Sequence, residues 1–175
     1  FNIALNKCKS KYIMGPNNDL VIQPNCIQTL IGEFEKNPSI SSLSPIDRKW
    51  HRHTKMYLPN EHKVYYGYDV SLHMFGCAFC CRREVFEKIG LLDERFYFFY
   101  QDNDYVMCLE RNNLLHGVHT GARVSHNTGG TDEIAPERCK YTPKNMNDQG
   151  DILHSKWKNE PFKSGGYKRY KEYNI

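Results

Sequence analysis

Residues 12–19 read Tyr12-Ile13-Met14-Gly15-Pro16-Asn17-Asn18-Asp19, a short apolar stretch that runs into a polar turn. The apolar residues favour a strand, and proline, asparagine and aspartate favour the turn after it. Asp19 therefore lies just past the end of a strand, where open α/β sheets bind ligands. About eighty positions later, Gln101-Asp102-Asn103-Asp104 closes an aromatic run in the same way. We expect these two segments to build one site.

Hydrophobic spacing predicts strands and helices on both sides of this stretch. Together they indicate an α/β fold, with a sheet flanked by helices. The expected helices are the end of one within residues 2–10, with Ile3, Ala4 and Cys8 on one face; one after Pro24, with Ile27, Leu30, Ile31 and Phe34 inward; residues 83–89; and residues 103–112, with Asp102 as N-cap. The expected strands are residues 12–14, 39–45, 71–75 and 77–81 hinged at Gly76, 114–119 and 123–126. Residues 95–100 are expected to be an aromatic strand or an extended segment.

Composition limits the classes of protein. The 175 residues, 39% of them hydrophobic and 13% aromatic, can bury one sizeable core. The net charge of +4 comes from interspersed charges, so no nucleic-acid partner is expected. No apolar run reaches the roughly 18 residues that cross a bilayer. Seven cysteines without a regular spacing favour reduced thiols, and hence a cytoplasmic location.

The three cysteines Cys77, Cys80 and Cys81 are crowded into five positions, which raises the question of zinc. Structural zinc sites commonly use two separated pairs of ligands, and no second pair matches this one. Alternating residues of a strand face opposite sides, and cysteine behaves as a small apolar residue. We therefore expect these side chains to be buried in the core.

Residues 47–69 form a long basic segment without hydrophobic periodicity. Loops of this length are commonly lids or recognition segments, but a solvated insertion explains them equally well. Trp50 favours recognition slightly.

The order of these motifs resembles the inverting, nucleotide-sugar-dependent glycosyltransferases of family 2, which have the GT-A fold. Residues 12–19 resemble the family's strand with its D-x-D metal motif, and residues 76–92 resemble its glycine followed by R-R-E-x-F-x-x-I-G-x-x-D. Residues 100–111 are similar to its E-D-x-D-x-x-x-R segment, and residues 126–131 to its H-x-x-G-G-S/T segment. The resemblance covers about residues 1–131, which we expect to form the core domain.

The resemblance implies a role for each motif residue. Asp19 and His126 would bind Mn²⁺ or Mg²⁺, which neutralises the charge on the departing diphosphate. Asp102 would be the catalytic base that accepts the proton of the acceptor hydroxyl. The donor sugar nucleotide or the acceptor, a glycan, lipid-linked or protein hydroxyl, would be bound by the remaining motif residues, Asn17, Gly76, Gln101 and Asp104. Asn17 and Gln101 replace acidic residues of the family motifs.

Each of these residues also has a structural explanation. Asp19 can stabilise a turn, Asp102 can cap a helix, and His126 can be a hydrogen-bonded structural residue. Gly76 can relieve a tight bend or line the sugar pocket, and both can hold.

The polar tail, residues 132–175, is expected to contain one short helix around residues 147–157. Its Ser155-Lys156-Trp157 sequence resembles a terminal K-W element of some family members, so Lys156 can reach a phosphate or simply be solvated. The lysines and tyrosines at its end can meet a partner or the cytoplasmic face of a membrane.

The family's N-terminal nucleotide-binding βαβ portion lies before the stretch that this chain matches. The chain is therefore expected to be the C-terminal part of a longer enzyme, unless another chain supplies those strands or transfer activity has been lost. Two functions follow: a metal-dependent inverting glycosyltransferase, or a catalytically silent module that binds carbohydrate or nucleotide or serves a structural role.

Overall fold

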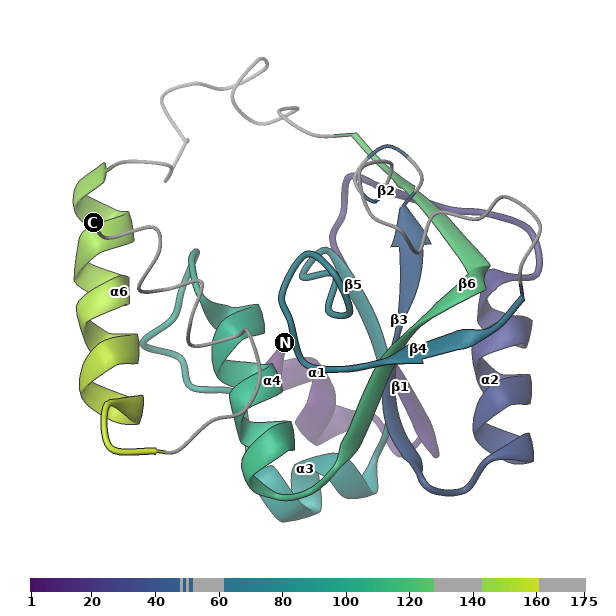
Figure 1. The fold of residues 1–175 in the computed structure, drawn as a ribbon, viewed down its shortest axis with the longest axis horizontal. Helices are drawn as coiled ribbons and strands as arrows, with labels where there is room; N and C mark the ends of the chain where they lie inside the picture. The colour runs from purple at the N-terminus through teal and green to yellow at the C-terminus, as the bar shows by residue number, and fades with distance from the viewer. Residues whose placement is uncertain (48, 50, 52–61, 128–142, 161–175) are drawn as a thin grey trace.

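A six-stranded mixed sheet forms the centre of the molecule (Figure 1). The computed structural model describes residues 1–47, 49, 51, 62–127 and 143–160. The strands are β1 (Tyr12–Pro16), β2 (Leu20–Ile22), β3 (Ile40–Asp47), β4 (Val64–Tyr66), β5 (Ala78–Arg82) and β6 (Leu115–His126). The helices are α1 (Asn2–Lys7), α2 (Cys26–Lys36), α3 (Glu84–Ile89), α4 (Gln101–Arg111) and α6 (Pro143–Trp157).

The strand order is β1-β5-β3-β6-β2, and β4 also pairs with β6. Strands β3 and β6 are parallel, whereas the other pairings are antiparallel. Helix α2 covers one face of the sheet, and α1, α3 and α4 lie on the other, with α6 outermost beside α4 (Figure 1). The predicted α/β sheet flanked by helices is confirmed.

Strand β5 divides the hydrophobic core into two clusters because its side chains alternate between the faces of the sheet. Phe79 and Cys81 pack among residues of α3 and α4, whereas Ala78 and Cys80 pack against α2. Cys80 and Cys81 are both buried. The two neighbouring cysteines therefore serve opposite sides of the core, as the strand period predicts.

Helix α2 presents a narrower apolar face than its spacing predicts. Leu30 and Phe34 are fully buried, whereas the side chain of Ile27 is 42% exposed. In α1 the predicted face with Ile3 is not the buried one, because Ile3 is 74% exposed and Leu5 is buried. The other buried residue of α1 is Asn2, whose side-chain nitrogen donates to the carbonyl oxygen of Leu92 at 2.8 Å and whose side-chain oxygen accepts the N–H of Leu92 at 3.1 Å.

The side chains of Arg82 and Arg83 donate hydrogen bonds to backbone carbonyl oxygens of neighbouring segments. Arg82 is buried, and its Nε donates to the carbonyl oxygen of Ile40 at 2.7 Å. Its guanidinium also donates to the carbonyl oxygen of Phe34, at the last turn of α2. Arg83 Nε donates to the carbonyl oxygen of Ser10 at 2.9 Å. The family-like R-R motif thus satisfies backbone carbonyls that these chain reversals leave unpaired.

Strand β6 is one element of twelve residues, where the sequence predicts two strands. Its pairing with β3 is interrupted, since Pro45 pairs with His119 but the next residue, Ile46, pairs with Arg123. Residues 120–122 therefore have no counterpart on β3. Such a bulge bends a strand without ending it, which carries the chain on to His126, where β6 pairs with Leu20 of β2.

The short strands β2 and β4 were not predicted. Each has three residues, and each pairs with a different part of β6. Strands of this length have too few residues for a periodic signal, and their partner is distant in the sequence. Strand β4 lies within the segment that we expected to be a loop.

The prediction of a strand at residues 71–75 is wrong. The backbone N–H groups of Leu72, His73 and Met74 donate to the carbonyl oxygen of Asp69, at 3.2, 2.8 and 3.1 Å. Ser71 has a φ of 66°. These three donors are therefore satisfied within a tight turn, by the carbonyl oxygen of Asp69. The only strand-like pairing of this segment among the described residues is an isolated bridge between Val70 and Met74.

The aromatic residues 95–100 form no strand. The N–H groups of Phe98 and Phe99 donate to the side-chain oxygen of Gln149, both at 3.0 Å, instead of to a neighbouring strand. Helix α4 begins two residues earlier than predicted, at Gln101, with Tyr100 at its N-cap. Asp102 is therefore not the N-cap but lies in the first turn, where its Oδ1 accepts the N–H of Asn103 at 2.9 Å.

Some predictions fall on residues outside the described part of the chain. These include the recognition role of Trp50, the Gly129-Gly130 pair, and the tail outside 143–160. Helix α6 is described, and it begins before the predicted residues 147–157. Among the described residues, no helix has the length and apolar character needed to cross a membrane.

Candidate active site

A cleft of about 1350 Å³ runs between the ends of β1 and β6 and the start of α4. Its walls are α1, strand β1 and the turn after it, the segment before β5, the aromatic residues 97–100 and the first turn of α4. The predicted site residues that line it are Asn17, Asp19, Gly76, Gln101, Asp102 and His126. The fold therefore brings together residues from both acidic segments.

Asp19 and His126 form a pair at one end of the cleft. The Nε2 of His126 is 3.1 Å from Oδ2 of Asp19. The pairing of β2 with β6 sets this distance, because Leu20 lies opposite His126 and the N–H of Asn127 donates to the carbonyl oxygen of Asp19 at 3.0 Å. The other carboxylate oxygen, Oδ1 of Asp19, is buried and has no hydrogen-bond partner among the described residues.

The imidazole of His126 is held on several sides. Its Nδ1 is 3.5 Å from the sulfur of Cys77, and its ring meets the edge of Phe75 with 6.1 Å between ring centroids. Its backbone N–H donates to Oδ2 of the buried Asp47 at 2.7 Å. The position of the ring is therefore set by β3, β6 and the segment before β5.

Gly76 lies directly against the carboxylate of Asp102. A Cβ on Gly76 would be 2.6 Å from Oδ2 of Asp102, which is closer than real Cβ contacts. The bare backbone thus allows the carboxylate to approach the segment before β5. This close approach explains why both residues line the same cleft.

Cys77 lies among the carboxylates of this cleft. Burial, together with the negative charges of Asp19, Asp102 and Asp47, raises the pKa of Cys77 to about 12. Its sulfur is therefore a neutral thiol at physiological pH, which disfavours a role as nucleophile. The sequence predicts Cys77 to be buried in the core, whereas in the structure it directly precedes β5, is partly buried and lines the cleft.

Asp104 and Lys156, in contrast, lie at the contact between α4 and α6. Asp104 is 4% exposed; its Oδ1 accepts the indole N–H of Trp157 at 2.7 Å, and its Oδ2 accepts from Nζ of Lys156 at 3.0 Å. Lys156 also donates to Oδ2 of Asp93 at 3.0 Å. Neither Asp104 nor Lys156 lines the cleft, so this geometry favours a structural role over the predicted binding roles.

Burial and hydrogen bonds act in opposite directions on the charges at this contact. Burial raises the pKa of Asp104, although Lys156 and Trp157 act to lower it. Burial disfavours the charged form of Lys156, but hydrogen bonds to Asp104 and Asp93 raise its pKa. Hydrogen bonds from Arg95 and then Lys156 hold the pKa of Asp93 well below its usual range. A Lys156 nitrogen engaged by two carboxylates is less available for a phosphate.

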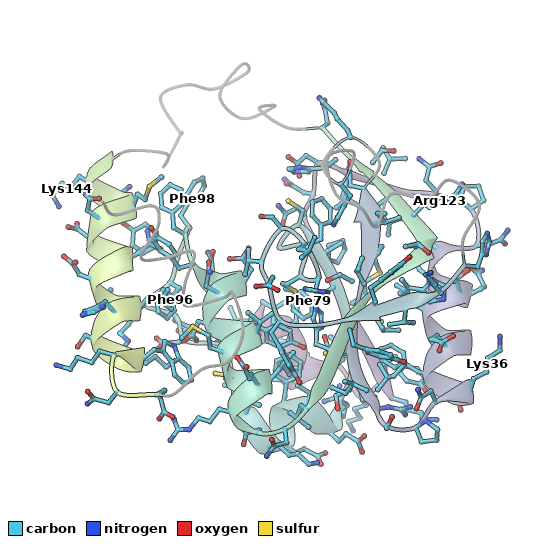
Figure 2. The ribbon with its side chains drawn as sticks, viewed as in Figure 1. Lys36, Phe79, Phe96, Phe98, Arg123 and Lys144 are labelled. Carbon is cyan, nitrogen blue, oxygen red and sulfur yellow. The ribbon has the colours of Figure 1, made fainter. Side chains whose placement is uncertain are left out.

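The aromatic wall of the cleft is attached to α6 by Gln149, which sequence analysis missed. This side chain is fully buried, and its oxygen accepts the two N–H groups of Phe98 and Phe99. Phe96 lies between α4 and α6 and packs against Met107, Leu153 and Trp157 (Figure 2). Helix α6 therefore holds residues 97–100 in position through the hydrogen bonds of Gln149.

Comparison with protein-family models gives a match over residues 1–90, to the model described as glycosyl transferase family 2. The chain belongs to this family. Its function is of the glycosyltransferase type, which implies a nucleotide-sugar donor and an acceptor in general terms. The mixed sheet flanked by helices is consistent with the GT-A-like fold expected for family 2. A search of curated proteins found no match.

The family 2 match spans α1 to α3, and so includes Asn17, Asp19 and Gly76. Asp102 and His126 lie beyond it, and their link to the family rests on the motifs and on their place in the same cleft. The roles of all these residues stay predictions.

Proposed function

We propose that this chain is a metal-dependent, inverting glycosyltransferase that moves a sugar from a nucleotide-sugar donor to a hydroxyl of a glycan, lipid-linked or protein acceptor. The observation that carries the proposal is the Asp19–His126 pair in one cleft with Asp102. This arrangement offers a cation-binding pair and a candidate base to the same bound substrate.

The Asp19–His126 pair supplies two candidate ligands for a divalent cation. A bound diphosphate would have to supply others, because the described residues contain no group of three or more histidines, cysteines or acidic residues that could hold a metal ion. Buried carboxylate oxygens normally have a partner, whereas Oδ1 of Asp19 has none among the described residues. Carboxylate oxygens suit Mg²⁺ or Mn²⁺, and an imidazole nitrogen shifts the preference toward Mn²⁺. When bound, the cation neutralises the charge that develops on the diphosphate leaving group.

Asp102 is the proposed base for the acceptor hydroxyl. An acceptor hydroxyl oxygen forms a bond to the anomeric carbon, the bond from that carbon to the diphosphate oxygen breaks, and the hydroxyl proton moves to Asp102. Attack from the face opposite the diphosphate inverts the anomeric centre. The hydrogen bond from Asn103 N–H to Oδ1 orients this carboxylate, and Gly76 leaves room for it.

A second candidate is a catalytically silent module that binds carbohydrate or nucleotide. Asn17 and Gln101 favour it, because both line the cleft at positions where the family motifs carry acidic residues. A neutral amide is a poorer ligand for a hard cation than a carboxylate. This candidate predicts binding of a sugar nucleotide without transfer.

Calorimetric titration with UDP-, GDP- and dTDP-sugars, with and without Mn²⁺, tests the proposal. We expect one nucleotide class to bind more tightly with Mn²⁺ and the Asp19→Ala variant to lose this enhancement. Binding that is independent of Mn²⁺ and unchanged in Asp19→Ala would contradict the metal site. Transfer assays with the nucleotide-sugar that binds then separate the enzyme from the silent module.

A further inference from the structure

Cys77 connects three parts of the cleft. It directly precedes β5, its carbonyl oxygen accepts the N–H of Asn17 at 2.9 Å, and its sulfur is 3.5 Å from Nδ1 of His126. The side chain is partly buried and lines the cleft. The family resemblance assigns no role to this thiol.

The two ring nitrogens of His126 face different partners. Nε2 faces Asp19 at 3.1 Å, whereas Nδ1 faces the sulfur of Cys77 at 3.5 Å. An imidazole that binds a cation through one nitrogen carries its proton on the other, and the acceptor of that proton fixes both the tautomer and the orientation of the ring. The sulfur of Cys77 lies within hydrogen-bond distance of Nδ1, the nitrogen that would carry this proton.

The other contacts of His126 do not distinguish its two ring nitrogens. The bond to Asp47 holds the backbone N–H, and Phe75 packs against the ring through its edge. Neither contact favours one nitrogen over the other. The sulfur also lies on the Nδ1 side, away from the Asp19 side, so the geometry favours a supporting role over direct ligation.

We propose that Cys77 is a positioning residue for His126: its sulfur accepts a hydrogen bond from the Nδ1–H of His126, whose proton stays on the ring, and so keeps Nε2 directed at Asp19 for cation binding. This inference rests on the proposed metal site and deepens it. It makes the cation affinity of the Asp19–His126 pair depend on a residue that does not touch the cation.

The test measures Mn²⁺ binding to the full chain by electron paramagnetic resonance of the free ion, with and without UDP. Cys77→Ala removes the acceptor, while Cys77→Ser keeps a hydrogen-bonding group of similar size. Loss of an outer partner typically costs about 10-fold to 100-fold in metal affinity. We expect a weakening of about 10-fold or more in Cys77→Ala, and near-native affinity in Cys77→Ser.

A matched control is Cys108→Ala, which removes another partly buried cysteine, on α4 and outside the cleft lining. We expect its Mn²⁺ affinity to equal that of the unmodified chain. Thermal unfolding of each variant verifies that the fold is kept. The ¹⁵N chemical shifts of the His126 ring provide a second measurement, since they report which nitrogen carries the proton.

Unchanged Mn²⁺ affinity in Cys77→Ala, with binding lost in His126→Ala, would overturn the inference and leave the proposed function standing. Equal weakening in the alanine and serine variants would also overturn it, because that result points to packing and not to a hydrogen bond. If the unmodified chain binds no Mn²⁺ under either condition, the metal site itself fails, and the role of Cys77 fails with it.

Discussion

The carboxylates of Asp19 and Asp104 come from similar acidic motifs but lie in opposite surroundings. Asp19 is at the cleft, 33% exposed, with one oxygen paired to His126 and the other without a partner among the described residues. By the same side-chain measure Asp104 is 6% exposed, and its oxygens accept from Lys156 and Trp157. The first can take a further ligand, whereas the second is already satisfied by its own protein.

This difference is one of hydrogen-bond satisfaction: Asp19 keeps an oxygen without a partner among the described residues, whereas both oxygens of Asp104 have partners. A buried polar group that has all its partners stabilises a structure, and a new ligand must displace one of them. A group with an unfilled hydrogen-bonding position gains from a ligand. Acidic motifs alone do not distinguish the two cases, because the partners of Asp104 come from α6, about fifty positions away in the sequence.

The largest expected effect is at Asp102, which belongs to the same first turn of α4 as Asp104 but lines the cleft. We expect Asp102→Asn to lower the rate of sugar transfer by about 10²–10⁴-fold, the typical contribution of a general base. Affinity for the nucleotide-sugar should be kept. Steady-state kinetics and calorimetry measure the two quantities, and a transfer rate equal to that of the unmodified chain would remove Asp102 as the base.

Gly76→Ala tests the position of the Asp102 carboxylate without changing Asp102 itself. The new Cβ, 2.6 Å from Oδ2 of Asp102, forces the carboxylate to move, and we expect a loss of transfer of about 10²-fold, as for a misplaced catalytic group. Gly32→Ala is the matched control, since nothing lies within 4 Å of its Cβ position on α2. That control should leave transfer unchanged and raise helix stability by about 0.5–1 kcal/mol. Equal activity of the two variants would contradict the assigned contact.

Asp104→Ala should affect stability more than chemistry. It removes the buried carboxylate oxygen that accepts the indole N–H of Trp157, and one of the two carboxylates bound by Lys156. We expect a loss of about 2 kcal/mol in the free energy of unfolding, measured by urea denaturation, with donor affinity kept in the folded fraction. The control Asp148→Ala breaks the exposed pair with Lys144 on α6 and should leave the unfolding midpoint unchanged. A stable Asp104→Ala variant that loses donor binding would reverse the two roles.

Sequence alone predicted the elements with a clear hydrophobic period. Helices α2 and α3 and strands β1, β3 and β5 lie close to their predicted positions. Strands β2 and β4 were missed because β6 supplies their pairing. The predicted strand at residues 71–75 failed because the carbonyl of Asp69 satisfies the same backbone donors locally.

The site was predicted in part for similar reasons. Motif order pointed to Asp19, Asp102 and His126, and all three line one cleft. Cys77 and Gln149 were missed as parts of the site because their significance lies in contacts with His126 and with the backbone of Phe98 and Phe99. Those contacts join residues about fifty positions apart, and no local pattern encodes them.

The bulge in β6 makes the cleft sensitive to chain length as well as to side-chain identity. Side chains of a strand alternate between its two faces, so a shift of one residue turns every later side chain to the other face. His126 follows residues 120–122, which have no counterpart on β3. A substitution within residues 120–122 can preserve the direction of the His126 imidazole. The insertion or deletion of one residue there would turn the imidazole away from Asp19, unless the rest of β6 shifted its pairing by one residue to compensate. The number of residues in this bulge therefore helps to determine whether His126 faces Asp19.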